Sequence, residues 1–132
     1  MYSRTGFKRS LRPSFSKTHQ KMGYFTYFCG IMSIKAKSPK NSFTIMNELV
    51  LPNDTNMLHN LMGGRLLHWM DIAAAISAQK HCNSLAVTVS VDSVSFKHSI
   101  KLGDVVTIEA RVSRAFNTSV EVRMDVYAEN IP

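Results

Sequence analysis

Apolar side chains recur at every second position in three segments of the chain, residues 85–96, 105–115 and 120–128. A period of two is typical of β-strands that turn one face toward a core. Residues 43–51 are also rich in strand-favouring side chains, and Pro52 ends them. Residues 97–104 and 116–119 carry turn-forming residues. The pattern therefore predicts four strands, with a loop over residues 52–64 after the first.

Residues 65–80 follow a helical period instead. They contain strong helix formers and neither Gly nor Pro. Apolar side chains cover most of the circumference, so we expect this helix to be buried on several sides. Lys80 and His81 suit its last turn, and Asn83 suits its C-terminal cap. A strand, a long buried helix and three further strands predict an α+β fold, with one central helix against an antiparallel sheet.

The two ends of the chain lack these patterns. Residues 1–40 are rich in Ser, Lys and Arg without a clear period, so we expect a basic, disordered tail before a domain of residues 41–132. This acid-free leader resembles a mitochondrial transit peptide, but we favour an upstream extension of the reading frame, since Met22 and Met32 would both serve as starts. The chain stops after its last predicted strand. We therefore expect a domain truncated at its C-terminus, or an edge that a partner covers.

The net charge of +7 is concentrated near the N-terminus. Residues 1–47 hold nine Lys and Arg and no acidic residue, whereas residues 48–132 hold seven basic and nine acidic residues. The predicted domain thus lacks the basic face of a nucleic-acid-binding protein, and we expect no nucleic-acid partner. No apolar run reaches the length of about 18 residues that a membrane span needs. We predict a cytoplasmic protein, or a mitochondrial one if the tail is a transit peptide.

The start of the predicted helix carries candidate catalytic groups. Gly63 and Gly64 precede it, and unpaired N–H groups there can bind a developing oxyanion, although a Gly pair is also common in tight turns. Asp71 lies about two turns inside the apolar helix. A carboxylate in such a place either acts as a general base or pairs structurally with Arg65, His68 or a strand residue.

Asn60 lies three residues before the Gly pair. It is either a turn former or an amide that holds a carbonyl or a water. At about 1.5 Å per helical residue, Asn60 and Asp71 would lie roughly 10–15 Å apart in one chain. If both act on one bond, one of them must come from another subunit, which predicts a dimer or a larger assembly.

Other catalytic chemistries lack their residues. The histidines are not at metal-ligand spacing from one another or from a cysteine, so we expect no metal and no cofactor. Cys82 has no His–Asn pair to activate it and is predicted to be a structural thiol. The two cysteines fit a reducing compartment. The serines of residues 90–95 lack the Gly-x-Ser-x-Gly motif of serine hydrolases.

Several motifs occur in a specific order. They are Asn-x-x-x-Asn-x-x-Gly-Gly at 56–64, Met-Asp at 70–71, Ser-Val-Asp at 90–92, Leu-Gly-Asp at 102–104 and Arg-Ala-Phe-Asn-Thr-Ser at 114–119. With them, residues 48–130 resemble the hotdog-fold acyl-CoA thioesterases, most closely the cytosolic acyl-CoA hydrolase group. The resemblance implies a five-to-six-stranded antiparallel sheet wrapped around the long helix. It also implies hydrolysis of acyl-CoA to a free fatty acid and CoA.

The resemblance further assigns roles to the candidate residues. Asp71 matches the helix carboxylate that acts as general base or nucleophile, and Asn60 matches a loop residue that cooperates from the facing subunit. The N–H groups near Gly63 and Gly64 would polarise the thioester carbonyl. The family pairs subunits edge to edge and commonly forms trimers of dimers, so a homodimer that assembles to a hexamer is implied.

Two departures from the family and two other functions stay open. Met62 stands where many relatives carry His or Phe, and the family continues with a further strand after the point where this sequence stops. One alternative function is an acyl-thioester dehydratase or hydratase, for which His68 is the candidate. The other is a non-catalytic acyl-CoA-binding domain, which would not need Asp71.

Overall fold

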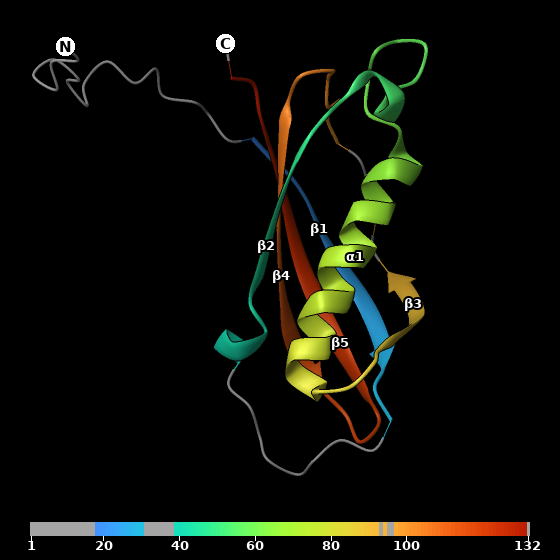
Figure 1. The fold of residues 1–132 in the computed structure, drawn as a ribbon, viewed down its shortest axis with the longest axis vertical. Coiled ribbons are helices and arrows are strands. Elements are labelled where there is room, and N and C mark those ends of the chain that lie inside the picture. The colour runs from blue at the N-terminus through green and yellow to red at the C-terminus, as the bar shows by residue number, and fades with distance from the viewer. Residues whose placement is uncertain (1–17, 31–38, 93, 95–96, 132) are drawn as a thin grey trace, which may run out of the picture.

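A computed structural model describes residues 18–30, 39–92, 94 and 97–131 of the chain (Figure 1). One long helix, α1 (Gly63–Cys82), runs along one face of a five-stranded antiparallel sheet. The strands are β1 (Thr18–Phe28), β2 (Thr44–Leu49), β3 (Val87–Asp92), β4 (Val105–Ala115) and β5 (Ser119–Glu129). Their order across the sheet is β2-β4-β5-β1-β3. The predicted α+β fold, with a central helix wrapped by an antiparallel sheet, is confirmed.

The elements with the clearest periodicity form close to where they were expected. Strand β4 has the predicted bounds, and α1 begins two residues before the predicted helix and ends two residues after it. Asn83 caps α1 in the left-handed conformation, at φ 53°, and its N–H donates to the carbonyl of Gln79. Short 3-10 turns at Pro39–Ser42 and Pro52–Asp54 flank β2.

Strand β1 is the main difference from the sequence-based expectation. Its residues were assigned to the disordered tail, and that assignment is wrong for residues 18–28 because they form a strand between β5 and β3. Gly23, Phe25 and Tyr27 are buried, whereas Phe28 is exposed. This alternation was not recognised as a strand signal among the residues assigned to the tail. The rest of the expected tail, residues 1–17 and 31–38, lies outside the described residues.

The prediction that the last strand is an unpaired edge is also wrong. Strand β1 pairs along the length of β5, from Thr18 opposite Ala128 to Phe28 opposite Ser119. In Figure 1 the blue strand β1 runs beside the red strand β5. The place next to β5 is therefore filled by a strand from the N-terminal part of the chain, and the sheet edges are β2 and β3.

The end of β1 is bonded covalently to the end of the helix. Cys29, directly after β1, forms a disulfide with Cys82, the last residue of α1, across a Cα–Cα distance of 6.0 Å. The prediction of a thiol at Cys82 is wrong, because β1 brings a second cysteine to it. The bond holds β1 and α1 together at this end of the domain.

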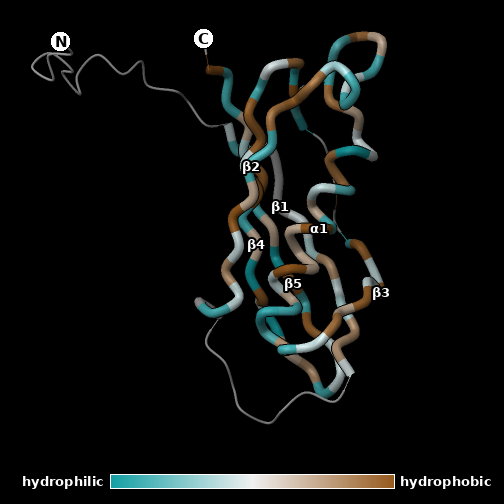
Figure 2. The backbone as a smooth tube through the Cα atoms, viewed as in Figure 1, coloured by the Kyte–Doolittle hydropathy of each residue, from teal (hydrophilic) through white to brown (hydrophobic). Residues whose placement is uncertain are grey.

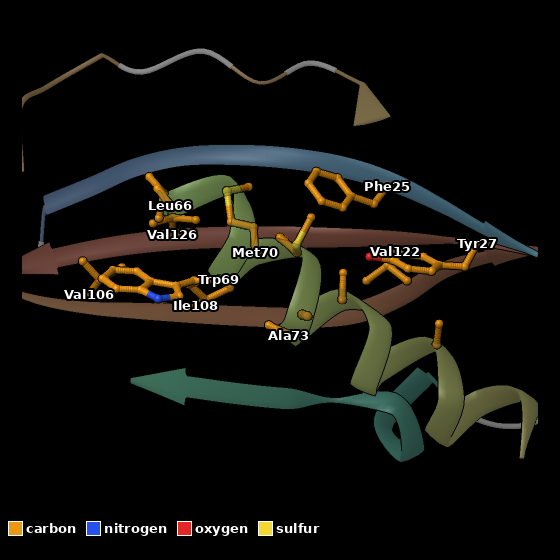
Figure 3. Packing of buried hydrophobic residues seen from close by; sticks show 14 of the residues in the cluster. Phe25, Tyr27, Leu66, Trp69, Met70, Ala73, Val106, Ile108, Val122 and Val126 are labelled. Atoms are coloured by element: carbon orange, nitrogen blue, oxygen red, sulfur yellow. The ribbon is translucent and has the colours of Figure 1, made fainter. Parts of the chain in front are cut away.

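The core lies between α1 and the facing side of the sheet (Figure 3). Met70, Ala73 and Ala74 of α1 are fully buried against strand residues that include Ile108 and Val122. The small alanine side chains let the helix approach the sheet closely. Gly23 also permits this approach, since a Cβ there would lie 3.0 Å from the Cε of Met70.

The outer edge strand differs from the rest of the sheet in what it exposes. On β3, Val87 and Val89 are each 63% exposed and Val91 is 47% exposed. Figure 2 shows hydrophobic colour along part of β3. Among the described helices, none is long and apolar enough to cross a membrane.

Candidate active site

Asp71 lies on α1 and is half-buried, and its side chain contacts the two strands β1 and β3. Its Oδ1 accepts a hydrogen bond from the Tyr27 hydroxyl of β1 at 2.5 Å, and another from the Thr88 hydroxyl of β3 at 2.9 Å. Two strand residues are thus the structural partners of Asp71, and neither Arg65 nor His68 is. Within the described part of the chain, Oδ2 accepts no hydrogen bond.

The two hydroxyl groups differ in their surroundings. Tyr27 is fully buried, and its pKa is raised well above the usual value, first by burial and then by its hydrogen bond to Asp71. The hydroxyl therefore stays protonated and acts as a donor. Thr88 is exposed on the edge strand. Both donors hold the same oxygen, which leaves the other carboxylate oxygen available to a reactant.

The loop before α1 is built around the side chain of Asn56. Its Oδ1 accepts the N–H groups of Leu58 at 2.9 Å and Asn60 at 3.2 Å. The amide oxygen is thus occupied, whereas the Nδ2 donors make no hydrogen bond to another described residue. An amide held in this way can donate to an acyl carbonyl or to a water.

Asn60 contributes to the same loop through its backbone. Its carbonyl accepts the N–H of Asn56 at 2.9 Å, and the residue forms an isolated bridge with Lys101. At the tip of the loop, Met57 is 96% exposed and Leu58 is 77% exposed. The loop therefore presents two large apolar side chains beside the Asn56 amide.

The start of α1 offers backbone donors. The N-cap residue, Met62, makes no side-chain capping hydrogen bond, and the N–H groups of Gly63 and Gly64 donate to no other described residue. A Cβ at Gly64 would meet nothing within 4 Å. The helix terminus is thus open on this side and can bind a negatively polarised oxygen.

A pocket of about 300 Å³ brings part of the predicted site together. Asn56, Asn60 and Gly63 line it, together with Lys97 and His98. Gly64 lines a different, shallower depression with Met62, Arg65 and His68. Asp71 lines neither of the two. In a single chain, Asn56 and Asn60 thus share a pocket with Gly63, and Asp71 does not line that pocket.

The fold and the sequence together define a class of protein. A family model described as the thioesterase superfamily matches residues 58–132, more than half of the chain. The chain therefore belongs to the thioesterase superfamily.

Similar proteins are named as enzymes that act on acyl-CoA thioesters. Acyl-coenzyme A thioesterase 11 of Mus musculus is 45% identical over 86 residues, which are 65% of this chain and 14% of that protein. Acyl-CoA thioester hydrolase YciA of Escherichia coli is 33% identical over 87 residues, 66% of each. The chain thus spans about one seventh of the length of the mouse relative.

Solved structures of acyl-CoA hydrolases have the same fold. The Staphylococcus aureus acyl-CoA hydrolase, in complex with butyryl coenzyme A and coenzyme A, superposes with a TM-score of 0.60 at 32% identity, over 73% of this chain and 70% of that one. A hexameric acyl-CoA thioesterase superposes with a TM-score of 0.61 at 31% identity, over 75% of each chain.

The Staphylococcus aureus hydrolase has also been solved with single alanine substitutions. They replace an asparagine, an aspartate that follows it in the sequence and a threonine that follows the aspartate.

Three residues of this candidate site, Tyr27, Thr88 and Asn56, were not predicted from the sequence. Tyr27 was overlooked because residues 18–28 were assigned to the tail. Buried and less buried positions alternate along residues 23–28, which is a strand signal. Thr88 was one of several polar residues in a predicted strand, and nothing local marks it. Asn56 was part of the recognised loop motif, but only the fold shows that its side-chain oxygen organises the loop.

Proposed function

We propose that this chain is an acyl-CoA thioesterase, which hydrolyses fatty acyl-CoA to a free fatty acid and CoA. The observation that carries the proposal is the Asp71 carboxylate, held through Oδ1 by two hydroxyl groups while Oδ2 accepts no hydrogen bond from the described residues. The family membership and the solved complexes with coenzyme A support it.

The spacing of three residues supports the assignment of the site. Asn56 precedes Asp71 in the sequence, and Thr88 follows it. The intervals from Asn56 to Asp71 and from Asp71 to Thr88 equal those between the substituted asparagine, aspartate and threonine of the Staphylococcus aureus hydrolase. We therefore assign the loop amide to Asn56 and give Asn60 a backbone role in shaping the loop.

The groups have complementary roles in hydrolysis. Asp71 Oδ2 removes a proton from a water that attacks the thioester carbonyl, or attacks that carbon itself. The N–H groups at Gly63 and Gly64 stabilise the negative charge that develops on the carbonyl oxygen. The carbon–sulfur bond then breaks and CoA leaves as the thiolate. Where Asp71 attacks the carbon itself, a water then hydrolyses the acyl-aspartate anhydride, which releases the fatty acid and regenerates Asp71. The Asn56 amide donates to the carbonyl or orients the water.

In a single chain Asn56 lines a pocket that Asp71 does not line, so one site that uses both residues needs two subunits. We propose that a homodimer, assembling further to a hexamer, places Asn56 of one subunit near Asp71 of the other. The exposed valines of β3 give the sheet an apolar edge that a second copy can cover, and Ile72 and Ile76 of α1 are also partly exposed. Two similar structures are described as hexamers.

Replacing Val89 with lysine is expected to convert the assembly to smaller species and to lower activity. The charge would lie in the centre of the exposed valine row, and the loss of the facing subunit would remove its Asn56. Size-exclusion chromatography with light scattering measures the mass. Ile45→Lys is the matched control, since Ile45 is 53% exposed on the opposite edge strand. An unchanged mass for Val89→Lys would contradict the proposed interface.

Replacing Asn56 with aspartate is expected to lower kcat by about a hundredfold, which is the usual effect of removing one oxyanion donor. Aspartate retains an oxygen for the N–H groups of Leu58 and Asn60, so the loop keeps its turn, but the Nδ2 donors are lost. Steady-state thiol release measures the effect. Asn60→Ala should lower kcat less than Asn56→Asp does. A larger loss of kcat for Asn60→Ala would instead assign the amide role to Asn60.

The proposed function is tested with acyl-CoAs of graded chain length and a reagent for free thiols. Turnover that depends on chain length supports the thioesterase. Binding of acyl-CoA without turnover, measured by calorimetry on the folded protein, would instead identify a non-catalytic acyl-CoA-binding domain. Conversion of an enoyl-CoA without thiol release would identify a hydratase.

A further inference from the structure

We propose that Tyr27 is a positioning residue for Asp71, so that the N-terminal strand β1 completes the catalytic site. The inference rests on the proposed function of Asp71. Tyr27 lies outside residues 58–132, which the family model matches, and β1 was not visible as part of the domain from its sequence.

The contacts of Tyr27 fit this role. Its side chain is fully buried, and Figure 3 shows the ring within the core cluster. The hydroxyl lies 2.5 Å from Asp71 Oδ1 and 3.1 Å from the Asp71 carbonyl oxygen. The ring is thus fixed by packing, and its one polar atom is directed at one residue of α1. A rigid donor of this kind orients the group that it contacts.

The orientation of Asp71 follows from two donors on one oxygen. Tyr27 approaches Oδ1 from β1, and Thr88 approaches it from β3. Rotation of the carboxylate would break both hydrogen bonds, so the two donors fix its orientation. No charged side chain among the described residues forms an ion pair with Asp71. The two hydroxyl groups are therefore the fixed polar partners of the carboxylate.

Strand β1 is itself held firmly enough to supply a precise donor. It pairs with β5 on one side and β3 on the other. Two residues after Tyr27, the disulfide between Cys29 and Cys82 joins the strand to α1. The Tyr27 hydroxyl and the Asp71 carboxylate are thus carried by two elements that a covalent bond joins at one end.

Tyr27→Phe removes only the hydroxyl and tests the inference. We expect kcat to fall about tenfold while KM changes less than about twofold, since positioning acts on the reacting groups and not on substrate binding. In an Asp71→Asn background, Tyr27→Phe should cause no further loss of the residual rate. Tyr24→Phe is the matched control, because it removes a hydroxyl from the other face of the same strand.

A second readout does not depend on activity. The Asp71 carboxylate carbon can be observed by carbon-13 NMR, and its chemical shift should change in Tyr27→Phe because the carboxylate loses one of its two donors. Tyr24→Phe should leave this chemical shift unchanged. An unchanged chemical shift and kcat, or an equal loss of rate in the Asp71→Asn background, would overturn the inference. If the wild type shows no turnover, the proposed function fails, and the chemical shift still decides the contact.

Discussion

Asp71→Asn is expected to lower kcat for acyl-CoA hydrolysis by about 10²–10⁴-fold, the range for loss of a general base. Asparagine has nearly the same shape and keeps an oxygen that can accept from Tyr27 and Thr88. It cannot remove a proton from water, and it is a poor nucleophile. Thiol-release kinetics measure the loss, and circular dichroism confirms that the variant is folded.

A second carboxylate provides the control for this variant. Asp92 is exposed at the end of β3, so Asp92→Asn removes the same charge from a nearby element without touching α1. Asp92→Asn should retain most of the wild-type rate. If folded Asp71→Asn hydrolyses acyl-CoA as fast as Asp92→Asn, Asp71 is not the catalytic carboxylate.

A chain that begins at Met32 is expected not to fold into the native domain. It lacks β1, which lies inside the sheet and pairs with two neighbours. It also lacks the buried rings of Phe25 and Tyr27. Removing one large aromatic side chain from a core costs about 3–5 kcal/mol, and whole domains are stable by only about 5–15 kcal/mol. Thermal unfolding followed by circular dichroism should show no cooperative transition.

The shortened chain also loses the disulfide, so that contribution needs its own control. The full chain with Cys29→Ser and Cys82→Ser keeps β1 and lacks only the covalent bond. It should unfold cooperatively at a lower temperature than the wild type. A Met32-start chain that unfolds as cooperatively as this double variant would show that β1 is dispensable.

The part of the fold that could be predicted has strong local signals. Strand β4 alternates over its whole length, and α1 has no breaker between Gly64 and Asn83, so their bounds follow from neighbouring residues. Strand β1 begins with polar residues and pairs with strands far away in the sequence. Its stability comes from those long-range contacts, which no local pattern contains.

The candidate site was predictable to a similar extent. Asp71 could be singled out because a carboxylate in an apolar helix needs an explanation. Its partners could not, since Tyr27 lies far before it in the sequence and Thr88 well after it, and only the sheet brings them together. The loop motif contains Asn56 and Asn60, two of the three asparagines in residues 52–64, and their sequence context does not distinguish a side chain that organises a turn from one that does not.

The central claim is that one thioesterase site is formed by Asp71 of one subunit and Asn56 of its partner. Mixing Asp71→Asn with Asn56→Asp subunits, after dissociation and reassembly, tests it most directly by thiol release. Each variant alone should be almost inactive, whereas randomly mixed dimers should regain about a quarter of the wild-type rate, because half are mixed and each has one intact site of two. If native mass spectrometry shows mixed dimers and the rate does not recover, the shared site is contradicted.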